Sequence, residues 1–449
     1  MSRDRKGATS NARAHMKPTP PSASIGIDFG TTNSSVAIAR PSGEITLASV
    51  PFMGVLTDSY RSLLYLEQAK ERGRDTLKSW TGPYGIERYL EAENKGRLIQ
   101  SLKSFLSSRT LKTTEVFGRR RTLEELIARV LKDLRIFAEE QFGVPIHSAV
   151  VGRPVRFVGA ESEDDNAYAE ERLREAFRIA GFETVAFEME PVAAAYYYES
   201  TLPHDELILI GDFGGGTSDF SLIHVGPEIR RRGRKPQDLL GNSGVGIAGD
   251  AFDAKIVRRL VSPVLGAGTQ LRSMDKMLPV PIWVYAKVEK WHHLSFLRTK
   301  DTLNMLRSVE AQAVEPEKIA ALLHLINEDL GYQLHRSVQA VKCALSASET
   351  ASFHFSDGVI ELEQSVKREA FEEWIAEELD QITTCVDGLV KKCGVQPGQV
   401  DKVFLTGGSS FVPSVRRIFE TRFGADRIRA GNEFTSVARG LALKARDIN

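Results

Sequence analysis

One short pattern occurs twice in this chain and constrains its fold more than any other feature. Residues 25–39 and 206–225 each read as an apolar strand ending in Asp-Phe-Gly, a turn of small residues and a returning strand. Glycines can take φ > 0 and leave backbone N–H groups bare, so such turns form nests for anions. Carboxylates lie beside both turns: Asp28 at the first, Asp212 and Asp219 at the second. Since a carboxylate repels a phosphate unless a cation lies between them, the repeat predicts a metal–phosphate site.

The two turns resemble the paired phosphate loops of the actin, hexokinase and heat-shock-protein-70 ATPase superfamily. Their amino-acid sequence is most similar to that of the corresponding loops in DnaK-type heat-shock-protein-70 chaperones. Further matches along the chain point to the shorter, YegD-like members of that family, which consist of the ATPase domain. The resemblance implies an α/β fold, namely a two-lobed, actin-like ATPase with ribonuclease-H-like sheets around a nucleotide cleft. It also implies ATP/ADP and Mg²⁺ as cofactors, slow ATP hydrolysis and a chaperone role in protein folding.

The composition is that of an ordinary globular protein. A length of 449 residues allows two to four domains, and Lys+Arg and Asp+Glu both total 59. The balanced charge gives no indication of nucleic acid or a membrane surface as a partner, and no apolar run reaches the length of a transmembrane helix. Cys343, Cys385 and Cys393 show neither a disulfide framework nor metal-type spacing. We therefore expect a cytoplasmic monomer that binds neither nucleic acid nor membrane.

The chain is expected to divide into four segments. Residues 1–24 are basic, acid-poor and without an apolar core, which predicts a disordered tail, with a transit peptide as the alternative. The resemblance implies ATPase lobe I over 25–205, lobe II over 206–430 and a C-terminal helix over 431–449 that packs back on lobe I. The family's chaperones continue into a peptide-binding domain and a helical lid. This sequence ends before them, so the resemblance implies ATP binding but does not imply polypeptide binding in the family's usual manner.

Periodicity predicts the elements between the turns. The clearest helix is 122–142, where Thr122 and Glu125 form a capping box ahead of an apolar stripe. The charged segment 67–100 reads as loop-rich. Further elements are expected as follows: strands over 44–66 and 148–157, and helices over 167–180, 317–350 and 366–393.

Two side chains outside the turns are candidates for catalysis. Lys103 lies among small and apolar residues, where a lone lysine is usually a surface residue with a buried stem. Glu190 precedes Pro191 and a run of alanines, so helix capping alone would account for it. The resemblance implies instead that Lys103 neutralises charge on the transferred phosphoryl group and that Glu190 orients metal-bound water. The candidate catalytic set is then Lys103, Glu190, Asp212, Thr217 and Asp219, and the candidate metal ligands are Asp28, Glu190 and Asp212.

Nucleotide-binding candidates lie in five segments. They are Gly30, Thr31, Thr32 and Asn33 in the first turn; Gly214, Gly215, Gly216 and Thr217 in the second; Gly249, in a glycine loop that runs from Gly241 to a helix beginning at Asp250; Gln339, Lys342 and Ser346 on one helix face; and Gly407, Gly408, Ser409 and Phe411 after an apolar strand. The resemblance assigns the last two segments to adenosine. The sequence departs from the family pattern at Gln339, Cys343, Phe411 and Phe434, so its phosphate end is matched better than its base end.

Three functions remain open. One is a DnaK-like ATPase that cycles between closed ATP and relaxed ADP states, with a co-chaperone or client-binding protein as partner. The second is a small-molecule kinase of the same superfamily, although no sugar-kinase signature accompanies the turns. The third is a nucleotide-gated scaffold or actin-like filament. The four carboxylates at positions 28, 190, 212 and 219 argue against a loss of hydrolysis.

Overall fold

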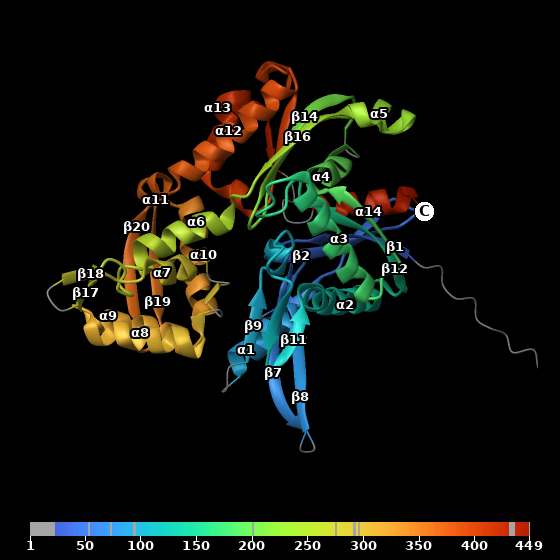
Figure 1. Cartoon of the computed structure of the whole chain (residues 1–449). Coiled ribbons are helices and arrows are strands. Elements are labelled where there is room, and N and C mark those ends of the chain that lie inside the picture. The colour runs from blue at the N-terminus through green and yellow to red at the C-terminus, as the bar shows by residue number, and fades with distance from the viewer. Residues whose placement is uncertain are drawn as a thin grey trace, which may run out of the picture.

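Two central β-sheets with the same strand order organise this mixed α/β fold (Figure 1). The computed structural model describes residues 23–448 apart from 53, 72–73, 93–95, 200–201, 274–275, 291–292, 295–296 and 431–435. The first sheet contains, in spatial order, β3 (Ile45–Leu47), β2 (Asn33–Ala39), β1 (Ala23–Phe29), β12 (Ile146–Arg153) and β13 (Thr184–Met189), and β6 (Tyr60–Arg61) also pairs with β2. The second contains β16 (Leu239–Val245), β15 (Ser218–Val225), β14 (Glu206–Phe213), β21 (Lys402–Thr406) and β22 (Ile428–Ala430).

The pairing directions are also the same in the two sheets. The first three strands of each sheet are antiparallel neighbours, and the last two run parallel to the third. Each predicted glycine turn joins the second and third strands of this order, β1 to β2 and β14 to β15. The turns therefore lie at the carboxyl ends of the parallel strands, which is where α/β proteins usually place a ligand site. The α/β class and the structural repeat are confirmed.

Two helices connect the sheets. Helix α14 (Ser436–Ile448) contacts β1 and β2 on one side and α4 (Glu190–Glu199) on the other, and α4 in turn contacts β14 and β15. The helices approach closely because Gly440 has no side chain: a Cβ there would lie 1.7 Å from the Ala193 carbonyl oxygen. Figure 1 shows α14, in red, returning beside β1 and β12 at the end of the chain.

The remaining elements flank the two sheets. On the side of the first sheet are β4 (Val50–Phe52), β5 (Val55–Thr57), β7 (Leu63–Glu71), β8 (Arg74–Thr81), α1 (Gly82–Glu91), β9 (Arg97–Gln100), β10 (Thr113–Val116), β11 (Arg119–Thr122), α2 (Leu123–Phe142) and α3 (Glu163–Ile179). On the side of the second are α5 (Pro227–Arg232), α6 (Gly249–Ile256), β17 (Gln270–Ser273), β18 (Lys276–Pro279), α7 (Ile282–Val288), α8 (Lys300–Gln312), α9 (Pro316–Asn327), α10 (Gly331–Ala347), β19 (Thr350–Ser356), β20 (Glu361–Lys367), α11 (Arg368–Trp374), α12 (Ala376–Lys392) and α13 (Pro413–Phe423).

Several sequence predictions hold. The capping box of α2 is present, since Thr122 Oγ1 accepts a hydrogen bond from Glu125 N at 3.1 Å. The strand predicted over 148–157 is β12, and the helix predicted over 167–180 is α3, which begins earlier because Ser162 caps it.

Other predictions about secondary structure are wrong. The segment 317–350 is two helices, α9 and α10, because the chain turns at Asp329 with a φ of 53°. The segment 366–393 begins in β20 and continues as α11 and α12, which are separated at Ile375. Apart from 72–73 and 93–95, the segment 67–100 forms the end of β7, then β8, α1 and β9 rather than loops; its strands accommodate charges because Glu67, Lys70 and Lys78 lie at exposed or part-exposed positions.

Two boundaries also shift, and three predictions fall outside the described residues. The segment 44–66 does not belong to one sheet, since β4 and β5 form a separate hairpin and β7 pairs with β8 and β9. The first strand begins at Ala23, inside the predicted tail. The rest of that tail, the first five positions of the predicted C-terminal helix (431–435) and Phe434 lie outside the part of the chain that the structure describes.

Candidate active site

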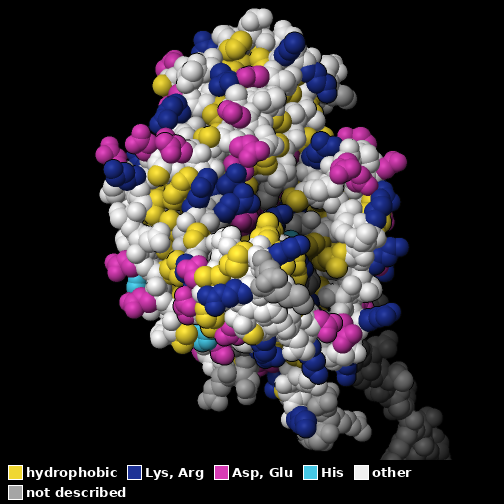
Figure 2. All heavy atoms as spheres, turned by 60° about the vertical axis from the view of Figure 1, so that its left-hand side comes forward, with side chains coloured by type: hydrophobic (Ala, Val, Ile, Leu, Met, Phe, Trp, Pro, Cys, Tyr) yellow, Lys and Arg dark blue, Asp and Glu magenta, His cyan; other side chains and the backbone are white. Residues whose placement is uncertain are grey.

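A single large cavity opens between the two glycine turns. Its volume is about 1480 Å³, and its wall is formed by both central sheets together with α6, α10 and the segment after β21. All of the predicted catalytic, metal and nucleotide residues line it except Gly216 and Asp219. The face shown in Figure 2 is hollowed near its centre, with hydrophobic and basic side chains around the hollow. Residues that are far apart in the sequence are therefore brought to one site.

The two turns lie face to face and have matching geometry. In each, four residues separate the last paired positions, which are Phe29 with Ser34 and Phe213 with Ser218. The turns approach so closely that a Cβ on Gly215 would lie 2.7 Å from Thr32 Oγ1. Contrary to expectation, the glycines of these turns do not have φ in the left-handed region. At Gly215 a side chain would fill the space between the turns, whereas at Gly30 a Cβ would lie 2.2 Å from the Asn33 carbonyl oxygen of the same turn.

The floor of the cavity holds a lysine among buried carboxylates. Lys103 Nζ donates to Glu190 Oε1 at 2.6 Å, and the two side chains are only 7% and 9% exposed. Burial tends to lower the pKa of Lys103, but the carboxylates of Glu190 and Asp28 outweigh this and hold the pKa above its usual value. Burial, followed by the Glu190 charge, raises the pKa of Asp28 to about 7 although Lys103 opposes the rise. Burial and the charges of Glu190 and Asp28 raise the pKa of Asp212 well above its usual value.

Asp219 lies behind the second turn. Its Oδ1 accepts hydrogen bonds from the backbone N–H groups of Val155 at 2.8 Å and Arg156 at 3.3 Å, and it is also hydrogen-bonded to the Thr217 side chain. Gly244 makes room for it, since a Cβ there would lie 2.7 Å from this oxygen. Burial and the Glu190 charge nevertheless raise the pKa of Asp219 to about 7. Asp219 therefore reaches the cavity only through Thr217.

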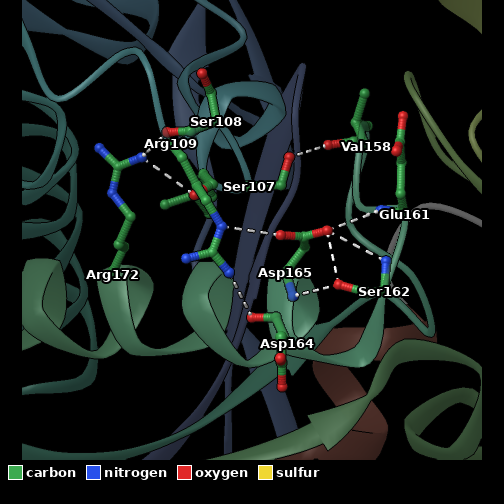
Figure 3. Close-up of polar contacts among 10 residues, drawn as sticks. Ser107, Ser108, Arg109, Val158, Glu161, Ser162, Asp164, Asp165 and Arg172 are labelled. Atoms are coloured by element: carbon green, nitrogen blue, oxygen red, sulfur yellow. Dashed lines mark hydrogen bonds and ion pairs between the residues drawn. The ribbon is translucent and has the colours of Figure 1, made fainter.

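The segment that carries Lys103 is held in place by α3. The backbone is left-handed at Ser101, with φ of 53°, and a short 3₁₀ helix, Leu102–Phe105, follows it. Figure 3 shows Arg172 of α3 reaching this segment: its guanidinium donates to the carbonyl oxygens of Leu106 at 3.1 Å and Ser108 at 3.0 Å. The same view shows the Ser107 hydroxyl donating to the carbonyl oxygen of Val158, which lines the cavity. These contacts fix the position of Lys103.

The chemistry of the carboxylates fits a hydrated magnesium ion. Asp28, Glu190 and Asp212 are oxygen donors beside one lysine, Lys103, and burial followed by the charges of the neighbouring carboxylates raises the pKa values of the two aspartates. A cation among them would favour their ionised forms. Among the described residues, no group of three or more His, Cys, Asp or Glu side chains is close enough to hold a metal ion. Mg²⁺ typically keeps several waters and uses one or two carboxylates together with substrate phosphates, so it does not need such a group.

The other end of the cavity is formed by α6, α10 and the segment after β21. Lys342 Nζ lies 2.6 Å from Asp253 Oδ1 and donates to the Gly249 carbonyl at 3.3 Å, which joins α10 to α6. Ser346 donates its hydroxyl to the Lys342 carbonyl within α10. Phe411 lines this end and is 51% exposed. A flat aromatic face at this end suits a nucleobase.

The glycine segments around this end are shaped by close backbone approach. Gly407 has a φ of 84°, and a Cβ there would lie 2.1 Å from the Phe213 carbonyl oxygen. The predicted loop from Gly241 is instead strand β16, while the predicted helix is α6, whose Asp250 N donates to the Gly215 carbonyl at 2.8 Å. Within β16, which pairs with β15, the absence of a side chain at Gly244 leaves space for Asp219.

Five charged lining residues were not among the sequence candidates: Asp58, Arg61, Asp250, Asp253 and Arg439. Asp253 could have been found from the sequence, because it is the last residue of the Gly-x-x-Phe-Asp pattern that begins at Gly249. Arg61 and Arg439 had no such signal, since a single arginine within a strand or a helix looks like any surface residue. Only the tertiary structure brings these residues to the cavity.

Comparisons with known proteins agree with this geometry. The family model "Hsp70 protein" matches residues 97–275 and 324–448. Two proteins named "Chaperone protein DnaK", from two strains of Thermus thermophilus, are each 24% identical over 432 residues, which cover 94% of this chain and 60% of the relative. A protein of the same name from Thermosipho africanus is 25% identical over 425 residues, covering 94% of this chain and 58% of the relative.

The chain therefore spans about 60% of the length of the curated relatives that it matches. In the described part of the chain, no helix is both long and apolar enough to cross a membrane. The family-model match covers more than half of the sequence and includes the second glycine turn, Lys103 and Glu190. By fold and by sequence, this chain belongs to the Hsp70 family and has its actin-like ATPase fold.

Proposed function

We propose that this protein binds ATP with Mg²⁺ in the cavity and hydrolyses it slowly to ADP and phosphate, as a DnaK-like ATPase. The observation that carries the proposal is the pair of equivalent glycine turns, face to face above buried carboxylates and Lys103. Phosphoryl transfer depends on positioning and charge neutralisation rather than on covalent chemistry by the protein. A rigid cavity with these groups meets that requirement.

The nucleotide is bound by backbone and side chains of this chain. The backbone of Gly30–Asn33 and Gly214–Thr217 holds the phosphates from the two sheets. In the second turn the donors are the N–H groups of Gly215–Thr217, because the Gly214 N–H donates to the Thr217 carbonyl oxygen. Gly407, Gly408 and Ser409 approach the nucleoside, and Phe411 offers its ring to the base. Lys342 and Gln339 lie beside them on α10. The charged groups thus receive the phosphates and the less polar end receives the base.

The catalytic groups act by charge and position. Asp28, Asp212 and Glu190 hold the hydrated magnesium ion, which supplies positive charge to the phosphates when it is bound. Lys103, fixed by its ion pair with Glu190, adds positive charge beside the transferred phosphoryl group. Thr217 positions the attacking water, and its hydrogen bond to Asp219 fixes the hydroxyl.

The family assignment supports a role for this ATPase in protein folding. We propose that lobe I (25–205, with the C-terminal helix packed on it) and lobe II (206–430) close around ATP and relax after hydrolysis, and that a co-chaperone or client-binding partner responds to this change. The relatives carry the name of a chaperone, and this chain matches about 60% of their length. The alternatives of a small-molecule kinase or a filament are not favoured by the family match.

Phosphate release from ATP by the purified protein with magnesium tests the proposal. We expect slow turnover in the parent and a loss of at least tenfold in Asp212→Asn and Lys103→Ala, since each removes charge at the reacting end. Asp380→Asn, an exposed change on α12, is the matched control and should keep the parent rate. Nucleotide affinity by calorimetry accompanies each rate. Turnover by the variants at the parent's rate would show contamination or a different site.

A further inference from the structure

The backbone of Arg61 is fixed against the first glycine turn. Strand β6 pairs with β2 so that Arg61 lies directly opposite Asn33, the last residue of that turn. Next to it, Ser62 N donates to the Thr32 carbonyl at 3.0 Å, and the Ser62 and Ser34 hydroxyls are hydrogen-bonded at 2.8 Å. A group that is held by the first turn is therefore within reach of the Arg61 side chain.

The Arg61 side chain spans the cavity from the first turn to α10. Its Nη1 donates to Asn33 Oδ1 at 3.1 Å, and its Nη2 donates to Gln339 Oε1 at 3.5 Å. Both acceptors are neutral amides. By contrast, Lys103 and Lys342, which line the same cavity, each have a carboxylate oxygen at 2.6 Å. Within the described part of the chain, Arg61 forms no ion pair with a carboxylate.

This environment is unfavourable for a cation that has no anionic partner. Burial lowers the pKa of Arg61 below its usual value; Tyr332 opposes the shift, and the positive charge of Arg336 adds to it. A buried charge is normally paired, because the loss of hydration is otherwise not compensated. The cavity thus presents a guanidinium whose electrostatic partner is missing from the protein itself.

We propose that Arg61 is a phosphate-binding residue of the nucleotide site. Its planar set of N–H donors matches phosphate oxygens, and it would exchange one or both amide acceptors for them. The neutrality of Gln339 is part of this arrangement: a carboxylate there would form an ion pair with Arg61 and compete with the phosphate. The inference rests on the proposed function, since it assigns a further contact in the same cavity.

Nucleotide affinities of Arg61 variants test the inference. We expect Arg61→Ala to weaken ATP and ADP binding by roughly 10- to 100-fold, the range for a lost hydrogen bond to a charged group. Adenosine, measured by competition, should bind both proteins equally, and Arg61→Lys should recover part of the loss. Gln339→Glu should weaken ATP binding in the same direction. Arg40→Ala is the matched control, because this exposed arginine at the far end of β2 does not line the cavity and is not among the charges that act on Arg61.

The outcomes separate this inference from the proposed function. If the parent binds neither ATP nor ADP, the proposed function fails and the inference fails with it. If the parent binds ATP and Arg61→Ala binds it equally well, the inference alone is overturned. An equal loss of adenosine and ATP affinity also overturns it, since that pattern indicates a nucleoside contact or a structural role. Thermal midpoints identify a variant that is merely unfolded.

Discussion

The substitution Asp219→Asn tests whether the negative charge of a buried carboxylate lowers the free energy of unfolding. Asp219 is 1% exposed, and burial together with the Glu190 charge raises its pKa from 3.8 to about 7. A raised pKa means that the folded protein binds this proton more tightly than the unfolded chain does. The resulting stabilisation is fully present below about pH 4 and is lost as the pH rises through about 7.

The expected size of the effect follows from that difference. A change from 3.8 to about 7 is a factor of roughly 10³ in proton affinity, or about 4 kcal/mol at 1.36 kcal/mol for each tenfold step. Asparagine keeps the shape without the charge: its oxygen can accept from Val155 N and Arg156 N, and its amide can donate to Thr217. We therefore expect equal stabilities near pH 4 and a variant that is more stable than the parent by up to about 4 kcal/mol at pH 8.

Urea unfolding midpoints between pH 5 and pH 8, in the presence of a chelator and without nucleotide, give the measurement. The advantage of the variant should grow with pH across this range. Asp380→Asn on exposed α12 is the control and should follow the parent at every pH. The reasoning is refuted if Asp219→Asn is less stable than the parent at pH 8, or if both have the same pH dependence.

Three further substitutions have defined expectations. Gly440→Ala should prevent α14 from docking and lower the melting temperature, because the new Cβ would lie 1.7 Å from the Ala193 carbonyl oxygen. The control Gly246→Ala, whose Cβ would have nothing within 4 Å, should melt like the parent, and equal melting temperatures for the two variants would contradict the close contact at Gly440. Lys103→Met should lower the free energy of unfolding, measured in denaturant titrations, by about 3–5 kcal/mol, because it leaves the buried Glu190 carboxylate without its lysine. A loss below about 1 kcal/mol would mean that the Lys103–Glu190 pair is solvated. Thr122→Ala should cost about 1 kcal/mol through loss of the α2 cap, with unchanged nucleotide binding; a change in binding would show that α2 affects the site.

Local patterns in the sequence predicted the parts of the fold that depend on local geometry. The helix of residues 122–142 was predictable because its cap and its apolar stripe lie within one segment. The long helix expected over 317–350 was not confirmed, because the break at Asp329 leaves the apolar periodicity on both sides intact. Charged segment 67–100 was misread because a strand with part-exposed residues tolerates charges that a buried strand does not.

In the candidate site, too, features that lie in consecutive residues were predicted from the sequence, and features that depend on contacts between distant segments were not. The two turns predicted the proposed phosphate end because each carries its chemistry in consecutive residues, and a role for Lys103 was predicted only through the resemblance. Arg61 could not be found from the sequence, since its position depends on the pairing of β6 with β2. The reason for Gly215 was also misjudged, because its need for space depends on a contact with Thr32 of the opposite turn.

By itself, the sequence determined that two like strand–turn–strand units with flanking carboxylates exist, and hence the α/β class and the family resemblance; the phosphate chemistry stays a prediction. Only the tertiary structure decided that the turns meet face to face, that Lys103 and Glu190 form a buried pair and that Asp219 lies behind the cavity. The physical reason is that turn chemistry is encoded in neighbouring residues, whereas burial and charge pairing depend on which distant segments the sheets and helices bring together.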